Sequence, residues 1–593
     1  MTSPLNNVAD LFEITIHSLS NDDVPSSTTL PIPQCLSQGF DSNQLGTARL
    51  RWLHVPANNL QWVQGIMEKW YHNRAGLDDS FWSLKVRPAP SQVKFQPPHS
   101  RHMEPSCFVD ADKSRNHNAQ SNVDHHRSHG RAAESGDRPL LHLYIPYMNW
   151  ELYQDFCTRT YAISSLHDLS ERQKKEKYLN ECIRNGIKVH PRRSLDQFYY
   201  SSLLDTSARD ADQTISKWTG TGLPKEGRSR ASHDALMILV DQLWCWVLDD
   251  NTVISFFPSH DLQYQHTEFT ELYQSVLAQW AESKTVWDLY SLLVGEATTF
   301  IFHQKNKSFT DLIETYRWVI KRKVASQTRC FQKFHDYNSS GNLDSILLDD
   351  RKELKLVLEV ADIADELKMI RHVIDKQREV VKSLIATLCT LHPATDDPRP
   401  SAITHVYVGE SLILHGNSSL TIQQSAPTMS ETVKMLAQGI KRPAGDTLVA
   451  TDEDLDFIGA EVDAIRNEAN TTHQALLSLL DLKQKAAALM EARATSQQGR
   501  VIMLFTIVTI IFLPLSFFTS YFGQNVSDIT GDEGNPTSIE LWRYGAPISI
   551  VVILAALLVA CYIAKLNLRR RFRKALIKRM QPFNIEELLD NEV

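Results

Sequence analysis

The sequence predicts an α+β membrane protein: a cytosolic α/β domain, a long helical stalk, and two C-terminal transmembrane helices, the first continuous with the stalk. Three observations support this fold class. Residues 501–522 carry no charged side chain, and residues 546–564 form a second apolar run. Each run approaches the ~20 residues needed to cross a hydrocarbon core. A long apolar repeat with helical spacing precedes the first run, and strand-like segments occupy the middle of the chain.

The composition describes a mostly water-soluble body around these runs. The 593 residues suit two or three domains, and the net charge of -8 gives no basic excess that would indicate nucleic-acid binding. The eight cysteines are scattered and form no CxxC pair, which argues against a disulfide framework or a structural zinc site. Residues 1–18 contain no arginine, so they resemble neither a secretory signal nor a mitochondrial transit peptide. The plasma membrane is therefore favoured over a mitochondrial membrane.

The N-terminal region, residues 1–139, is expected to be only partly ordered. Residues 1–45 are rich in Ser, Asn, Pro and Asp, whereas residues 48–55 are strand-like and 58–70 are helix-like. Residues 86–138 are dominated by polar residues and proline, which predicts a disordered insertion. A zinc or copper site is the weaker alternative for the insertion, because its histidines lack regular ligand spacing: His99, His102, His117, His125, His126 and His129.

Residues 140–270 are predicted to form the cytosolic α/β domain. Residues 140–146 have the composition of a strand, and residues 149–185 are helix-like. Residues 236–257 read as a hairpin, with apolar and aromatic residues on both sides of a polar turn at 249–251. Strands with flanking helices favour an α/β arrangement.

Residues 271–500 are predicted to form a helical region and stalk. Apolar residues recur at helical spacing through 351–391, and a similar series runs from Ile458 to Met490. No proline interrupts residues 455–513, so we expect one helix, partly coiled coil, that continues into the first apolar run and is roughly 85–90 Å long. The alternative is an ordinary amphipathic helix packed on its own domain.

The two apolar runs predict transmembrane helices at 501–522 and 546–564. The loop between them, residues 523–545, is acidic, and a basic tail at 565–593 follows. The positive-inside rule therefore puts both termini in the cytosol and the loop outside. The loop acids attract cations to the membrane surface or are simply solvated: Asp528, Asp532, Glu533 and Glu540.

Several segments resemble the CorA family of divalent-cation transporters, in particular its large fungal branch. They include residues 479–485, 491–493 and 505–523, and in the cytosolic part residues 190–200 and 240–252. The resemblance covers roughly 140–580. The family signature after the first span is Gly-Met-Asn, and here it is a GQN variant, Gly523-Gln524-Asn525.

The resemblance implies a homopentamer that takes up divalent cations, in particular Mg²⁺, driven by the membrane potential and gated by the cytosolic ion. One Asn525 carbonyl from each subunit would then bind the hydrated ion, because Mg²⁺ sheds water reluctantly. Gly523 would let the chain leave the helix, and Gln524 would support the Asn525 ring or compete with it.

Further pore residues follow from the same resemblance. Ser516 would supply a second polar ring, or else its hydroxyl bonds to a carbonyl of its own helix. Apolar constrictions that gate by dewetting would be formed by Leu513, Phe505 and Ile502.

The sequence thus predicts a divalent-cation channel or transporter whose partners are membrane lipid, further copies of itself and the transported cation, with no cofactor. Two alternatives stay open: a transport-inactive regulatory or ion-sensing homologue, and a membrane-anchored coiled-coil scaffold. No nucleophile–base motif or phosphate-binding loop indicates an enzyme.

Overall fold

A computed structural model describes thirteen stretches of the chain, which form two compact units. The first unit is Met1–Leu343 with Asp349–Leu479, and the second is Asp344–Leu348 with Leu480–Val593. The described stretches are residues 11–40, 48–71, 102–110, 140–157, 171–184, 189–219, 235–259, 271–303, 311–340, 350–391, 443–523, 526–532 and 534–579.

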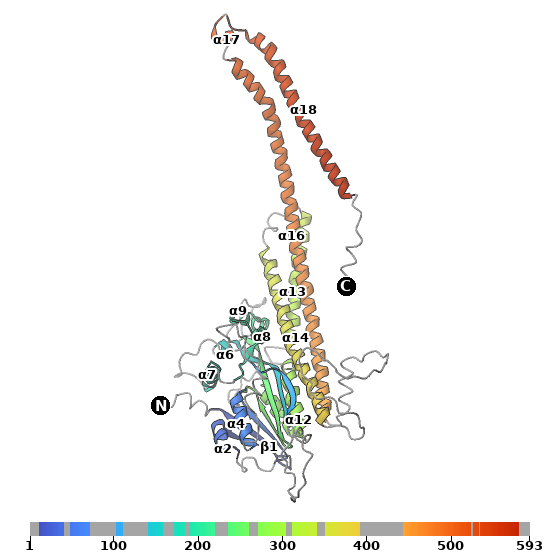
Figure 1. Ribbon diagram of the computed structural model, residues 1–593. Coiled ribbons are helices and arrows are strands. Elements are labelled where there is room, and N and C mark those ends of the chain that lie inside the picture. Colours follow the sequence, from blue (N-terminus) through green and yellow to red (C-terminus); the bar gives the residue numbers. More distant parts are fainter. Residues whose placement is uncertain are drawn as a thin grey trace, which may run out of the picture. The chain divides into compact units, whose positions relative to one another are not determined.

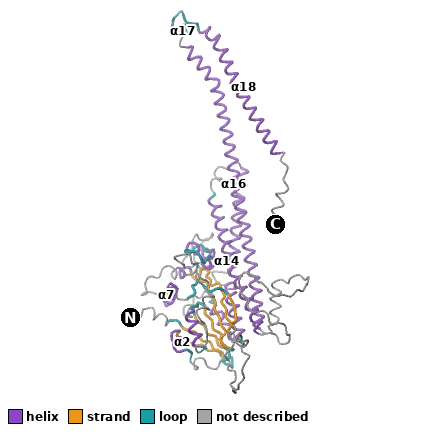
Figure 2. Tube along the Cα trace, in the orientation of Figure 1, coloured by secondary structure: helices purple, strands orange, loops and turns teal. Residues whose placement is uncertain are grey.

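The first unit is built on an eight-stranded sheet (Figures 1 and 2). Its order is β2-β1-β3-β8-β7-β5-β4, and β6 also pairs with β7. All neighbouring strands are antiparallel except β3 and β8, which are parallel. The strands are β1 (Glu13–Leu19), β2 (Pro25–Pro31), β3 (Leu50–Val55), β4 (Ser106–Asp110), β5 (Leu140–Leu152), β6 (Arg193–Ser194), β7 (Leu236–Asp249) and β8 (Thr252–Phe256).

The two long strands β5 and β7 form the centre of this sheet. They pair antiparallel from His142 opposite Trp246 to Leu152 opposite Leu236. Nearly every residue of β7 is buried, because helices cover both faces of the sheet. A strand covered on both faces reads as a continuous apolar run rather than an alternating one.

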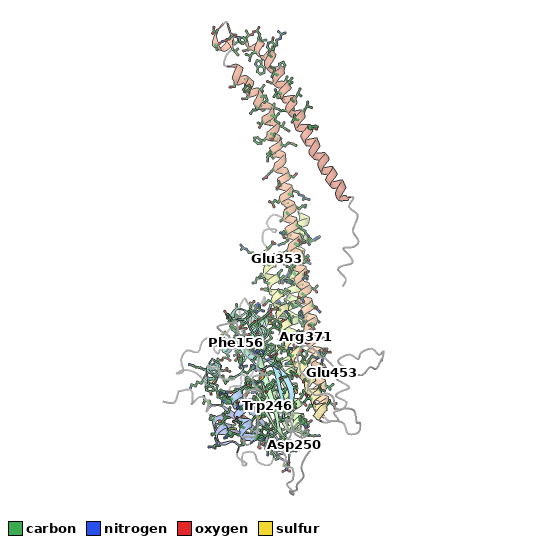
Figure 3. The ribbon with its side chains drawn as sticks, viewed as in Figure 1. Phe156, Trp246, Asp250, Glu353, Arg371 and Glu453 are labelled. Carbon is green, nitrogen blue, oxygen red and sulfur yellow. The ribbon has the colours of Figure 1, made fainter. Side chains whose placement is uncertain are left out.

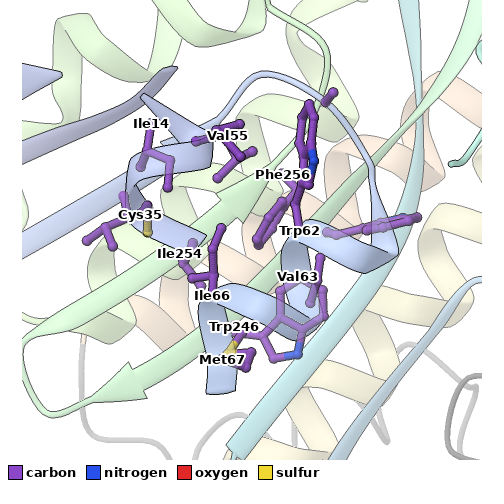
Figure 4. Close-up of a cluster of buried hydrophobic side chains, with 14 of the residues drawn as sticks. Ile14, Cys35, Val55, Trp62, Val63, Ile66, Met67, Trp246, Ile254 and Phe256 are labelled. Atoms are coloured by element: carbon purple, nitrogen blue, oxygen red, sulfur yellow. The ribbon is translucent and has the colours of Figure 1, made fainter. Parts of the chain in front are cut away.

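One face of the sheet is covered by α2 (Ile32–Gln38) and α4 (Leu60–Trp70). Figure 4 shows the resulting core, in which Val63 and Met67 of α4 meet Trp246, Ile254 and Phe256 of the central strands. The opposite face packs against α12 (Val286–His303) and α14 (Arg351–Leu391). Alternate strand residues therefore enter two separate cores.

The remaining helices complete the two units. They are α6 (Tyr153–Cys157), α7 (Glu171–Arg184), α8 (Leu195–Tyr199), α9 (Ser207–Asp210), α10 (Thr214–Trp218), α11 (Leu272–Gln279), the 3-10 turn η5 (Trp280–Glu282), α13 (Leu312–Ser340), α16 (Pro443–Gly523), α17 (Ser527–Thr530) and α18 (Ser538–Arg579).

Helix α16 confirms the predicted long helix, which is continuous from Pro443 to Gly523. The predicted apolar series is its packed face in the first unit: Ile458, Val462, Ile465, Ala469, Thr472, Leu476 and Leu479 are buried. Ion pairs fix this part of α16 to α14, including Arg371 Nε to Asp463 at 2.9 Å (Figure 3 labels Arg371). Helix α16 is therefore one long helix, and its part up to Leu479 also packs as an amphipathic helix on the first unit.

The structure differs from the sequence-based prediction in the N-terminal half. The sheet takes β1, β2 and β3 from residues 13–55, so its strands are not confined to 140–270. Strand β4 lies inside the predicted insertion 86–138, where Cys107 pairs with Leu143 of β5. β5 also continues to Leu152, so helix begins only at Tyr153. The polar composition of β2 misled the prediction because β2 is an edge strand with an exposed surface.

Candidate functional site

The candidate site lies in the second unit, on the end of α16 and the loop that follows it. The apolar stretch of α16 ends at Phe517, and an 18-residue window within it is 0% buried. The apolar window of Ser538–Val559 is 6% buried. The core helix of a soluble protein would be mostly covered. Both helices are long and apolar enough to cross a membrane, and their exposure fits that role better than a buried core.

The four predicted pore-lining residues of α16 share one face of the helix. Ile502, Phe505, Leu513 and Ser516 fall within an arc of about 80° at 3.6 residues per turn. All four are exposed in the single chain. The structure therefore brings them into one stripe, which we call the α16 stripe.

Sequence reasoning missed Thr509 as a polar member of the α16 stripe. Thr509 lies seven residues after Ile502 and so falls on the same face. Its hydroxyl donates to the Phe505 carbonyl oxygen at 2.8 Å. Within the described part of the chain, the Ser516 hydroxyl makes no such bond to its own helix. A heptad count from Ile502 would have identified Thr509.

The helix persists through a proline to the first residue of the GQN sequence. Pro514 lies inside α16, and Gly523 is the last residue of the helix. Neighbouring groups can satisfy a carbonyl freed by proline in a membrane helix. Gln524 and Asn525 lie outside the described residues, so the predicted ion-binding ring stays a prediction. The described chain resumes at Val526, which is buried.

The acidic loop residues have different surroundings. The Asp528 carboxylate accepts a hydrogen bond from the Ser538 backbone N–H at 3.1 Å, which lowers the pKa of Asp528 and caps the start of α18. Asp532 and Glu540 are exposed, and Glu540 lies in the first turn of α18, where a negative charge is favourable. Glu533 lies outside the described residues.

Gly531 closes the short helix α17 with φ of 73°, a left-handed conformation. A side chain at this position would strain the backbone, so the turn depends on glycine. The Ser527 backbone N–H donates to the Pro536 carbonyl at 3.3 Å. The loop is therefore a compact turn held by its own backbone.

Among the residues that the structure describes, no three His, Cys, Asp or Glu side chains are grouped so as to hold a metal ion. Of the six histidines in the predicted insertion, only His102 lies in a described stretch. It is buried, with Nε2 3.7 Å from the Glu104 carboxylate.

One comparison with known proteins gives a match in the C-terminal part of the chain. Residues 418–571 match the family described as CorA-like Mg2+ transporter protein. The match includes both apolar helices and the GQN sequence, and it confirms the resemblance for this part of the chain. The fungal branch and the significance of the GQN variant stay predictions.

The comparison with solved structures is weaker. It finds the CorA magnesium transporter from Methanocaldococcus jannaschii at 9% identity, over 92% of this chain and 96% of that chain, with a TM-score of 0.24. A likeness at this level carries no argument about fold or function. No curated protein matches the chain.

Proposed function

We propose that this chain is one subunit of a homopentameric channel or transporter for hydrated divalent cations, in particular Mg²⁺. The match of residues 418–571 to the CorA-like Mg2+ transporter family carries the proposal. Two exposed apolar helices within the matched range support it, because each can cross a bilayer. Both termini then face the cytosol, in the plasma membrane.

The α16 stripe is the proposed lining of the pore. Mg²⁺ keeps most of its waters, so neutral oxygens suit it as ligands. Asn525 carbonyls would accept hydrogen bonds from ion-bound water at the mouth, and Ser516 hydroxyls would do so further along. Leu513, Phe505 and Ile502 would form apolar rings that close the pore by dewetting.

The membrane potential supplies the driving force in this proposal. A divalent ion gains roughly 4.6 kcal/mol per 100 mV of inside-negative potential, twice the value for one charge. The exposed Asp532 and Glu540, together with Glu533, would raise the cation concentration at the mouth. Asp528 contributes less, because its carboxylate caps α18. The cytosolic ion would gate the pore from inside.

A second candidate is a transport-inactive homologue that senses ions. The observation that favours it is Gln524, which replaces the central residue of the Gly-Met-Asn signature. The Gln524 side chain carries the same amide group as Asn525 on a longer stem, so it can compete with the proposed ring of Asn525 side chains for ion-bound water. Measured transport separates the two candidates.

The test is Mg²⁺ uptake in transporter-deficient cells that express the full chain, with surface expression measured in parallel. We expect uptake that falls at least about tenfold in Asn525→Ala, equivalent to 1.4 kcal/mol of lost ion binding. Asn535→Ala is the matched control, because Asn535 is an amide of the same loop whose partner is Thr530. Uptake that survives Asn525→Ala contradicts the ring mechanism. Uptake that appears only in Gln524→Met supports the inactive homologue.

A further inference from the structure

A cluster of carboxylates joins three short helices to two long ones in the first unit. Helices α8, α9 and α10 lie within residues 195–219: α8 and α10 pack against α14, α10 also packs against α13, and α9 packs against α8. The cluster contains two cations. Arg209 pairs with Asp196 and Asp365, and Lys217 pairs with Asp212 and Asp362. The carboxylates outnumber these cations: they are Asp196, Asp210, Asp212, Asp362, Asp365 and Glu366.

Glu366 is the central member, because one side chain joins three helices. It lies on α14 and is 3% exposed. One of its oxygens accepts the backbone N–H of Thr214, the first residue of α10, at 2.7 Å. The other accepts the hydroxyl of Tyr316 on α13, also at 2.7 Å. The docking of α10 therefore depends on the state of this carboxyl group.

The cations nearby are occupied by other carboxylates. Lys217 Nζ lies 2.8 Å from Asp212 and 3.4 Å from Asp362, which is one helical turn before Glu366. Arg209 lies between Asp196 at 2.5 Å and Asp365 at 2.7 Å. Among the described residues no salt bridge reaches Glu366. Glu366 is buried, whereas the Asp362 side chain is 29% exposed, and a negative charge on Glu366 would have to share Lys217 with Asp212 and Asp362.

We propose that the contact of α10 with α13 and α14 is a proton-controlled latch, which is closed while the Asp362–Glu366 pair holds a proton and loosens when that proton leaves. When protonated, Glu366 can donate to Tyr316 and still accept from Thr214, so both contacts persist. When it is ionised, its charge repels Asp362 inside the protein. The latch does not depend on ion transport by the chain.

The proton affinities of the pair agree with this geometry. Burial raises the pKa of Glu366 well above its ordinary value, and the nearby Asp362 raises it further. Burial also raises the pKa of Asp362 to about 6, against the opposing effect of Lys217. Asp210, on α9, has its pKa raised by burial to about 7. Asp362 and Asp210 therefore titrate nearer to neutral pH than an ordinary aspartate, and Glu366 titrates well above its ordinary value.

The direction of the pH effect follows from linkage. A carboxyl group with a raised pKa in the folded state stabilises the contact fully below its ordinary pKa. That stability is lost as the pH rises from the ordinary value to the raised one, which is about 6 for Asp362 and well above the ordinary value for Glu366. The latch should therefore loosen with alkalinity. It acts on α14, whose Arg371 and Arg378 form ion pairs with α16.

The test is hydrogen exchange of the purified full chain in detergent at about pH 6 and about pH 8, around and above the raised pKa of Asp362, with labelling times scaled for intrinsic exchange. We expect residues 212–219 to lose protection at the higher pH. Glu366→Gln should abolish that loss, because its amide can accept from Thr214 and donate to Tyr316 without ionising. Glu379→Gln is the control on the same helix, since Glu379 is a surface residue paired with Lys376. It should keep the wild-type response.

Two results would overturn the latch: equal protection of the wild type at both pH values, or an undiminished pH response in Glu366→Gln. Should Glu366→Gln fail to fold, Asp362→Asn decides the question. Removing the neighbouring charge should lower the pKa of Glu366 and shift the midpoint of the response to lower pH. An unchanged midpoint contradicts the proposal.

Discussion

The buried ion pair at the centre of the sheet makes a quantitative prediction about stability. Arg192 precedes β6, and its Nε and one terminal nitrogen donate to the two oxygens of Asp241 at 3.0 and 2.9 Å. Its other terminal nitrogen donates to Glu151 at 3.1 Å. The three side chains are 7%, 0% and 2% exposed. One guanidinium therefore binds two carboxylates inside the protein.

Arg192→Met keeps an unbranched side chain and removes the charge. It removes the guanidinium from the buried Asp241, although Asn149 still donates to Asp241 at 3.0 Å. Breaking a buried pair in this way costs about 3–5 kcal/mol. At about 2–4 °C per kcal/mol for a domain of this size, Tm should fall by roughly 6–20 °C. Adding Asp241→Leu should recover part of that loss, because the second substitution removes an unpaired charge.

The measurement is thermal unfolding of the full-length protein in detergent, followed by tryptophan fluorescence at one scan rate. Trp244 and Trp246 lie on the same strand as Asp241 and are buried, so they report on this core. Lys376→Met is the matched control, because Lys376 forms an exposed pair with Glu379 worth at most about 1 kcal/mol. If Arg192→Met is no more destabilising than Lys376→Met, the argument from burial is wrong.

Three further predictions concern the same unit. Burial lowers the pKa of His17 to about 4, so as the pH falls below about 6.5 the unfolded chain binds a proton before the folded chain does. Acidification from pH 7 to 5 should therefore lower the free energy of unfolding by about 2 kcal/mol. His17→Gln should reduce this dependence of the unfolding free energy on pH, as unfolding curves would show. Trp246→Ala should destabilise the core by about 3–5 kcal/mol, whereas Trp318→Ala, at a side chain 47% exposed, should have a much smaller effect on the same transition. Burial raises the pKa of Cys35 and Cys107 to about 12. A maleimide reagent should therefore modify these thiols only after denaturation, as mass spectrometry would show. Rapid labelling of the native protein would contradict their burial.

The helices were the most predictable part of the fold. The apolar spacing in 351–391 predicts α14, and the series from Ile458 onward predicts the buried face of α16. Both signals are local, because residues three and four apart share a helix face. The hairpin of β7 and β8 was predictable for the same reason, since the polar turn lies between its strands.

The N-terminal strands were less predictable because their partners are distant in sequence. β3 pairs in parallel with β8, where Arg51 lies opposite Thr252 across about two hundred residues. β4 pairs with β5 across a long stretch of polar sequence. No periodicity within either short strand indicates such a partner, and the composition of the intervening sequence favoured disorder.

Some features of the candidate site were also predictable from local sequence, and others were not. Helical spacing alone places Ile502, Phe505, Leu513 and Ser516 on one face of α16, whereas their choice as pore residues comes from the resemblance. The capping role of Asp528 was not predictable, since its partner Ser538 lies ten residues later, on the far side of a turn. The roles of Gln524 and Asn525 rest on the family match rather than on described geometry.

Helix α16 changes its surroundings along its length without changing its secondary structure. Up to Leu479 a single stripe is buried, as in a helix packed on a water-soluble core, but from Val501 to Phe517 it is apolar on all sides and uncovered. Such a surface needs lipid or another apolar partner. Thr506 and Thr509 suit that environment, because both hydroxyls donate to carbonyls four residues earlier and need no water. Ser516 makes no such bond among the described residues. In the proposed pore, water would be a partner for its hydroxyl.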